Sequence, residues 1–215
     1  MPGFGPMFTG PGTAGPIIRG LGTLVPETIV EVFGSTSDGV IKCGWDPDWS
    51  DVWNGLVSII TTDDDGGHGQ AMYVYAGPGF NYISRSFLFF DLSSPPDIGA
   101  PKRVTLVIYG ATNHDSSVSV QEGTQHDPLI DADFTAWTGP QFALHPWAVP
   151  LNEIKFNPDG IAYIASKIGS TAKLCLRECT RDYFNNPPGE TVDLENGMHY
   201  QDQIEGYRPY LKITY

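Results

Sequence analysis

The chain has 215 residues, of which 25 are acidic and 12 are lysine or arginine, so its formal net charge at pH 7 is −13. Binding to nucleic acid or to an anionic membrane surface needs clustered positive charge, so we expect neither as a partner. No run approaches the roughly 20 apolar residues of a membrane span, so we also expect no membrane insertion.

The composition predicts an all-β fold. The sequence holds 25 glycines, 18 prolines and 26 aromatic residues, and it lacks long leucine-rich periodic segments, a balance typical of short strands joined by turns. We predict a two-sheet β-sandwich of the jelly-roll type in residues 27–215, with one short helix and about nine or ten strands. The length suits a single domain of this kind.

Residues 1–26 predict an extended Gly/Pro-rich N-terminal arm, because this composition forms neither a helix nor a core. We expect the arm to grip neighbouring subunits, and the alternative is an arm wrapped on its own domain. No basic segment followed by an apolar one is visible, so a Sec signal peptide is not expected. The apolar anchors of the arm would be Phe4, Met7, Phe8, Ile17 and Ile18.

Four strands are expected in the first third of the domain. Alternation over residues 28–33 indicates the first of them, and a Gly-Ser-Thr-Ser-Asp-Gly turn follows it. Shorter apolar runs predict strands at residues 40–43, 56–61 and 71–75.

A tryptophan-rich loop, GWDPDWSDVWNG, separates the second and third of these strands. Its tryptophans are spaced by four residues, but a proline and flanking glycines favour a structured loop with one helical turn over a regular helix. Aromatic rings stack on the apolar faces of sugars, and neighbouring aspartates accept hydroxyl protons. The loop is therefore a candidate glycan site, although large aromatic residues more often cover a core. The residues of this candidate site are Trp45, Trp49, Trp53 and Asp48.

The acidic loop TTDDDGGHGQ is a candidate calcium site. Asp63 and Asp65 offer the carboxylate oxygens that Ca²⁺ prefers. A solvated acidic turn is the alternative, since the full EF-hand pattern is absent.

Residues 85–109 are the stretch around which we expect the domain to be organised. Residues 87–90 are apolar at every position, which predicts a strand covered on both faces. A second strand is expected at residues 104–109, where β-branched residues are frequent. Three prolines and a glycine lie between them, so the two strands form either a wide hairpin or a crossover from one sheet to the other.

This stretch, RSFLFFDLSSPPDIGAPKRVTLVIYG, resembles the signature of DNRLRE-type domains, which are similar to carbohydrate-binding modules. The match rests on a Phe-Asp-Leu-Ser run at residues 90–93 and on Thr105, Leu106, Ile108 and Tyr109. It continues weakly through residues 134–137 and the closing strand at 208–215, and so covers residues 27–215. The resemblance implies a jelly-roll fold and a non-catalytic role on secreted, cell-surface or viral proteins, although fold alone does not fix function.

The second half of the chain predicts further strands at residues 117–121, 174–179 and 210–215, with loop-rich segments at 122–150 and 185–206. Trp137 and Trp147 are expected to plug the core beneath the first loop-rich segment. A helix should begin after a capping Asn157 followed by proline and end at Gly169. Its buried stripe would be Ile161, Ile164, Ala165 and Ile168.

Two further sets of reactive side chains are better explained by structural roles than by chemistry. Cys43, Cys175 and Cys179 are odd in number and lack a CxxC pattern, so we expect buried thiols and no disulfide framework. A set of His-Asp pairs lacks a nucleophile in a recognisable context, which argues against catalysis. These pairs are His114 with Asp115 and His126 with Asp127.

The sequence favours a non-catalytic structural surface protein, a head-decoration, fibre or spike component of a virion that attaches through its arm. Its partners would be further copies of itself or other subunits of the particle, and its location the virion or the extracellular surface. The alternative is a carbohydrate-binding module that targets a glycan or a cell surface. A small polysaccharide lyase or hydrolase is the third possibility. An acidic surface suits solubility and display.

Overall fold

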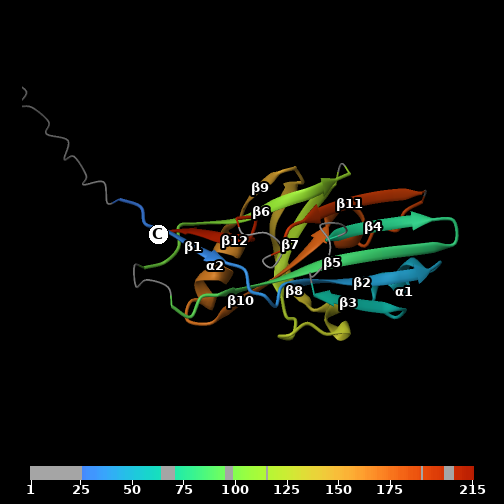
Figure 1. The fold of residues 1–215 in the computed structure, drawn as a ribbon, viewed down its shortest axis with the longest axis horizontal. Coiled ribbons are helices and arrows are strands. Elements are labelled where there is room, and N and C mark those ends of the chain that lie inside the picture. The colour runs from blue at the N-terminus through green and yellow to red at the C-terminus, as the bar shows by residue number, and fades with distance from the viewer. Residues whose placement is uncertain (1–25, 64–70, 95–98, 115, 190, 201–205) are drawn as a thin grey trace, which may run out of the picture.

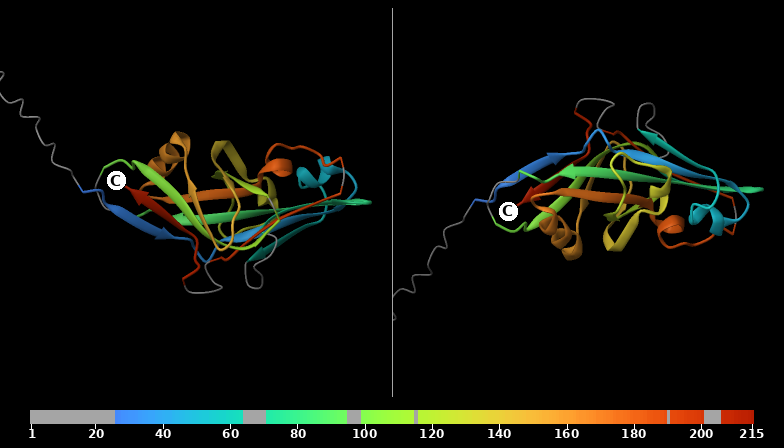
Figure 2. Two further views of the ribbon diagram at one scale, coloured as in Figure 1. Left: turned by 90° about the horizontal axis from the view of Figure 1, so that it is seen from above. Right: turned by 90° about the horizontal axis from the view of Figure 1, so that it is seen from below.

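The structure is a computed structural model that describes residues 26–63, 71–94, 99–114, 116–189, 191–200 and 206–215. Within these residues twelve strands form an all-β, sandwich-like fold in which every strand pair is antiparallel. Two layers of strands make up an elongated body (Figures 1 and 2). The predicted arm, with its anchors Phe4, Met7, Phe8, Ile17 and Ile18, lies outside the described residues.

The layers share one path of hydrogen-bonded strands. In the first layer β12 and β9 flank β6, β1 pairs with β12, and β6 continues through β11 to β4. These strands are β1 (Ile29–Phe33), β4 (Met72–Gly77), β6 (Arg103–Asn113), β9 (Leu151–Lys155), β11 (Val192–Met198) and β12 (Tyr210–Thr214). In the second layer the order is β3-β2-β5-β10-β7-β8. These strands are β2 (Gly39–Asp46), β3 (Ile59–Asp63), β5 (Phe80–Asp91), β7 (Ser117–Gly123), β8 (Trp137–Pro146) and β10 (Thr171–Glu178).

Strand β5 joins the two layers and carries both cores. Its first residues pair with β4 and its last residues with β10, so the layers separate along its length. Because successive side chains alternate, Leu88 and Phe90 enter the main core between the layers, whereas Ile83 and Phe87 enter a second core on the opposite side. Residues 87–90 are at most 1% exposed, which confirms the prediction of a strand covered on both faces.

The connection from β5 to β6 is a crossover between layers. The two strands do not pair with each other, because β5 pairs with β2, β4 and β10 while β6 pairs with β9, β11 and β12. Of the two interpretations of residues 85–109, the crossover is therefore correct and the wide hairpin is wrong.

Two segments predicted as loops contain strands. The segment 122–150 holds the ten-residue β8 and a 3₁₀ helix, η1 (Asp131–Thr135), and the segment 185–206 holds β11. Among the described residues β8 pairs only with β7. As an edge strand it tolerates the glycine and prolines that argued against a strand in the sequence. β11 was not predicted because its charged residues, Asp193 and Glu195, made the segment read as a polar loop. In the strand they occupy alternate positions. β9 was not predicted either, so the described residues hold twelve strands where nine or ten were expected.

The helices follow their capping signals more closely than their apolar patterns. In α2 (Pro158–Lys167) the side chain of Asn157 accepts the Gly160 N–H at 3.0 Å, as predicted, and Gly169 takes a φ of 88° after the helix. The predicted stripe is only partly correct, because the buried residues are Gly160, Tyr163 and Ile164 and Ile168 is 37% exposed. A Cβ atom at Gly160 would lie within 3 Å of the side chains of Phe142 and Phe156, so the helix packs closely against these two phenylalanines.

Two short helical turns accompany the second core. The predicted turn in the tryptophan loop is α1 (Trp49–Trp53), and a π-helical turn, η2 (Cys179–Tyr183), follows β10. The three cysteines are buried and unpaired, as expected. Burial raises the pKa of Cys43 to about 11 and that of Cys175 to about 12, so both are thiols at neutral pH.

Candidate functional site

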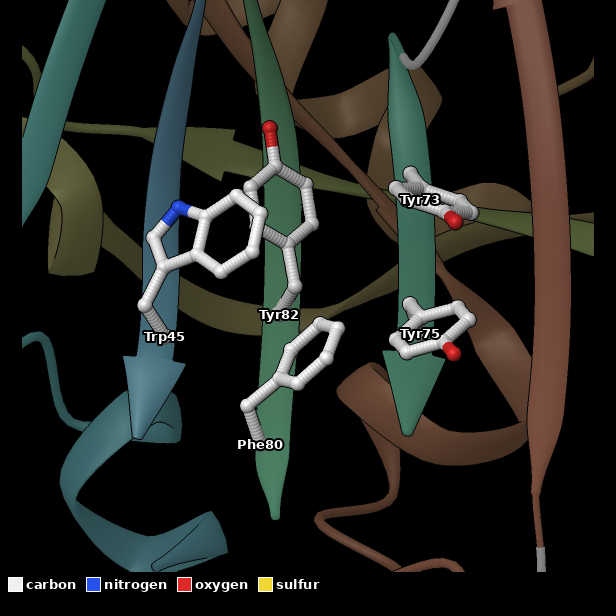
Figure 3. Close-up of a pocket in the computed structure, with 5 residues that line it drawn as sticks. All are labelled: Trp45, Tyr73, Tyr75, Phe80 and Tyr82. Atoms are coloured by element: carbon white, nitrogen blue, oxygen red, sulfur yellow. The ribbon is translucent and has the colours of Figure 1, made fainter. Parts of the chain in front are cut away.

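Five aromatic side chains line an open pocket of about 230 Å³ near the turn between β4 and β5. They come from three neighbouring strands, and Figure 3 shows them side by side on one surface of the sheet. The turn lies at the end of the molecule opposite to Tyr215 and to the start of β1 (Figure 1). We call this surface the aromatic face. Its residues are Trp45 on β2, Tyr73 and Tyr75 on β4, and Phe80 and Tyr82 on β5.

Strand register brings these rings together. Tyr75 pairs with Tyr82, and alternation puts Tyr73 and Phe80 on the same side of the sheet. The intervening residues point the other way, where Val74 is buried in the second core. Residues 80–82 of β5 are half-buried whereas residues 83–90 are buried, so the aromatic face lies at the more open end of the strand.

The rings contact one another in a continuous row. Phe80 stacks on Trp45 and on Tyr75, with centroid separations of 5.0 Å in both pairs. Tyr73 lies 5.4 Å from Tyr82 in a tilted arrangement. Trp45 at the end of the row is 67% exposed, an unusual fraction for the largest apolar side chain.

Two glycines make room for tyrosine rings. A Cβ atom on Gly77 would lie 2.5 Å from the hydroxyl of Tyr75, and one on Gly44 would lie 2.6 Å from the ring of Tyr82. Since real Cβ atoms do not approach other atoms so closely, the positions of both rings depend on the absence of a side chain beneath them.

The backbone at Trp45 is strained. Its φ of 71° is in the left-handed region, which costs a non-glycine residue on the order of 1–3 kcal/mol. The register of β2 shifts there, between Gly44 and Asp46. The side chain of Asn81 donates to the carbonyls of Asp46 and Pro47, at 3.2 and 2.9 Å, and so holds the shifted backbone in place. The fold thus maintains a costly conformation that exposes a tryptophan.

Two carboxylates border the aromatic face on β11. In the strand register Asp193 lies opposite Tyr75 and Glu195 lies opposite Tyr73, and we call this pair the acidic flank. Burial raises the pKa of Tyr73 above its ordinary range, and the charges of Asp193 and Glu195 raise it further. The acidic flank therefore acts electrostatically on the aromatic face.

A histidine joins the acidic flank. His114 Nδ1 lies 3.9 Å from Asp193 Oδ1, and Thr112 donates its hydroxyl to Glu195 at 2.8 Å. One ligand atom each from His114, Asp193 and Glu195 lies within 4.8 Å of the other two. These are nitrogen and oxygen ligands that suit a divalent cation. The calcium site predicted from the sequence is elsewhere: Asp65 and the side chain of Asp63 lie outside the described residues, so that site stays a prediction.

The three predicted tryptophans do not share a surface. Trp45 belongs to the aromatic face, but Trp49 is only 8% exposed and donates its indole N–H to Asn185 at 2.9 Å. Trp53 donates to the carbonyl of Asp182 at 2.8 Å. Asp48 caps α1 by accepting the N–H of Ser50. The spacing of Trp49 and Trp53 reflects α1, which turns both to the opposite side of the sheet from the pocket, whereas Trp45 lies on β2.

On that opposite side, buried charged groups lie among aromatic side chains. The guanidinium of Arg85 is fully buried, donates to the Asp182 carboxylate at 2.6 and 2.9 Å, and lies 4.0 Å from the centroid of Phe134. Arg177 also donates to Asp182, at 2.9 Å, and its guanidinium lies 4.2 Å from Trp137. Burial raises the pKa of Asp182, but the two guanidiniums outweigh it and hold the pKa below its ordinary value. We call the cluster of Arg85, Arg177, Asp182, Phe134 and Trp137 the closed box.

The two histidine-aspartate pairs singled out in the sequence do not form one site in the structure. His126 Nδ1 lies 2.8 Å from Asp133, and the same carboxylate accepts the backbone N–H groups of His126 and Ile130, an arrangement that stabilises η1. His114 belongs to the acidic flank, Asp127 precedes a cis proline, and Asp115 lies outside the described residues. These histidines therefore have different partners in different parts of the fold.

Four of the five pocket residues were not predicted from the sequence. The signal was available in MYVYAGPGFNYIS, where an aromatic residue occupies every second position on either side of a Gly-Pro-Gly turn. Such alternation in a hairpin predicts a row of rings on one side.

No protein-family model matches the chain, and no curated protein matches its sequence. Among the described residues no helix is both long and apolar enough to cross a membrane. The resemblance to DNRLRE-type domains stays a prediction, and the all-β, sandwich-like architecture is the part of its implications that the structure shows.

Proposed function

We propose that this protein binds carbohydrate through the aromatic face and does not catalyse a reaction. The observation that carries the proposal is an open pocket of five aromatic rings bordered by carboxylates. Aromatic rings pack against the apolar C–H surfaces of a sugar, while tyrosine hydroxyls and carboxylates hydrogen-bond to its hydroxyl groups. The exposed and strained Trp45 fits a residue retained for contact with a ligand.

The arrangement of the acidic flank argues against the lyase or hydrolase alternative. Glycosidases place the scissile bond between two carboxyl groups, whereas Asp193 and Glu195 are two residues apart on one strand and so lie on the same side of the pocket. A lyase needs a general base with a pKa near neutrality, and the pKa of Tyr73 is raised, not lowered. A binding role is therefore the better fit.

The predicted role as a virion component stays a prediction beside this proposal, because the arm on which it rests lies outside the described residues. A particle subunit that displays a glycan-binding surface would combine both roles. The mass of the protein in solution, with and without residues 1–16, would test it. An unchanged monomer would count against an assembly held by the arm.

Removal of rings from the aromatic face tests the proposal. We expect Trp45→Ala and Phe80→Ala each to weaken glycan binding by about tenfold or more, because each removes apolar contact and a stacked pair. Phe33→Ala is the matched control, since Phe33 is 49% exposed on β1. Binding would be measured on a glycan array and then by isothermal titration calorimetry with the best oligosaccharide. Undiminished binding by Trp45→Ala would show that the proposal is wrong.

A further inference from the structure

We infer that the aromatic face selects glycans by charge: it favours sugars with protonated amino groups over neutral sugars, and it excludes uronates and sulfated sugars. The inference rests on the proposed function and names the substrate class of the same site. It is carried by the placement of the acidic flank beside the rings and by the way the closed box holds its cations.

Negative charge predominates around the aromatic face. Asp193 and Glu195 lie directly across from Tyr75 and Tyr73 and share their side of the sheet. His114 lies beyond the acidic flank. By alternation Lys42 shares this side of the sheet, opposite Ser84 on β5. Lys42 is three strands from Glu195, about 14 Å at the usual strand spacing.

The acidic flank is close enough to act on a bound sugar. Directly paired residues in an antiparallel sheet have Cβ atoms about 5 Å apart, which is shorter than the Debye length of about 10 Å at 0.1 M salt. The charges of Asp193 and Glu195 also raise the pKa of Tyr73, so they already act on one of the rings. A ligand charge over Tyr73 or Tyr75 would therefore be only weakly screened from Asp193 and Glu195.

The closed box shows how this fold holds a cation. On the other side of the same strand, Arg85 lies 4.0 and 4.2 Å from the centroids of Phe134 and Trp137 and pairs with Asp182. Rings attract cations through their quadrupoles, and the carboxylate adds a charge-assisted hydrogen bond. The aromatic face offers the same two components, rings and carboxylates, and no arginine is among the residues that line its pocket. A protonated amine is the ligand group that matches both.

Three hexasaccharides with β-1,4-linked pyranose backbones test the inference: one of glucosamine, one of glucose and one of a uronic acid. Affinities would be measured by isothermal titration calorimetry in EDTA, so that no divalent cation neutralises the acidic flank. At low salt we expect the glucosamine oligomer to bind about 3- to 10-fold more tightly than the glucose oligomer, the effect of one or two exposed charge pairs. The uronate should bind most weakly. At 1 M salt, where the Debye length is about 3 Å, the preference should largely disappear.

Variants separate the charge of the acidic flank from the rings. In the double variant Asp193→Asn/Glu195→Gln the ratio of glucosamine to glucose affinity should fall to near one. Glu153→Gln on β9, outside the pocket, is the matched control and should keep the wild-type ratio. Equal or tighter binding of the uronate would overturn the inference while leaving the proposed function in place. If none of the three oligomers bound, and no other glycan bound in a manner that depends on Trp45, both would fail.

Discussion

The two sides of the sheet around β5 carry similar residues, aromatic rings and carboxylates, but one side is buried and the other is open. On one side, Arg85, Arg177 and Asp182 lie among aromatic rings and are sealed beneath α1, η1 and η2. On the other side, the aromatic face and its carboxylates are open. The two sides differ in whether other elements cover the strand. Residue type alone therefore does not separate a structural cluster from a binding surface.

The energetic costs of the two sides also differ. The closed box takes three charged groups out of water, a cost that close pairing and hydrogen bonds must offset. The aromatic face instead maintains a left-handed Trp45 and leaves apolar area in solvent. Mutations in the closed box should therefore affect stability, whereas mutations in the aromatic face should affect binding.

The largest effect is expected in the closed box. Asp182→Asn leaves the guanidiniums of Arg85 and Arg177 buried without their counter-ion, and we expect it to lower the free energy of unfolding by about 3–5 kcal/mol. Urea denaturation followed by tryptophan fluorescence would measure the change. Asp193→Asn on the open side should change stability by no more than about 0.5 kcal/mol. Equal effects of the two substitutions would remove the distinction between the two sides.

A smaller effect, confined to binding, is expected from Gly77→Ala. The new Cβ would lie 2.5 Å from the Tyr75 hydroxyl, and the ring can rotate away because it is the end of a side chain. Glycan affinity should fall about tenfold with little loss of stability, since alanine also restricts the unfolded chain. Gly189→Ala, with no atom within 4 Å of its new Cβ, is the matched control. If Gly77→Ala bound as wild type, the orientation of Tyr75 would not matter to the site.

Local signals predicted the parts of the fold that depend on local physics. Residues 87–90 were predicted as a doubly covered strand, and Asn157 as the cap of α2, because each signal acts within a few residues. β8 and β11 could not be predicted, since their polar and proline-containing sequences become strands only through pairing with β7 and with β4 and β6. Tertiary pairing thus overrode their weak intrinsic preference.

The candidate site was only partly predictable, for a related reason. Trp45 was singled out, but its spacing from Trp49 and Trp53 suggested one platform, and the structure turns those two toward the second core. The other rings come from β4 and β5, and the acidic flank from β11, more than a hundred residues further along the chain. Sequence spacing cannot show that β2 and β11 lie on either side of the β4–β5 hairpin.

The smallest expected effect is a change in the titration of Tyr73, and it tests whether the acidic flank touches the aromatic face. The raised pKa means that native Tyr73 stays protonated above pH 10, where an unfolded tyrosine would ionise. Its contribution to stability is therefore fully present below about pH 10 and is lost as the pH rises through the native pKa. Asp193→Asn removes the nearer charge, so the pKa of Tyr73 should fall toward its ordinary value.

The ten tyrosines make a difference measurement necessary. The ultraviolet absorbance of phenolate would be titrated in the wild type and in Tyr73→Phe, and the difference assigned to Tyr73; the same pair would be compared in the Asp193→Asn background. The melting temperature should also fall less between pH 8 and pH 11 in Asp193→Asn than in the wild type, because less of the native-state shift remains. An unchanged Tyr73 titration would mean that the carboxylate does not reach the rings. In that case selection by charge would lose its basis, while the row of rings could still bind a neutral sugar.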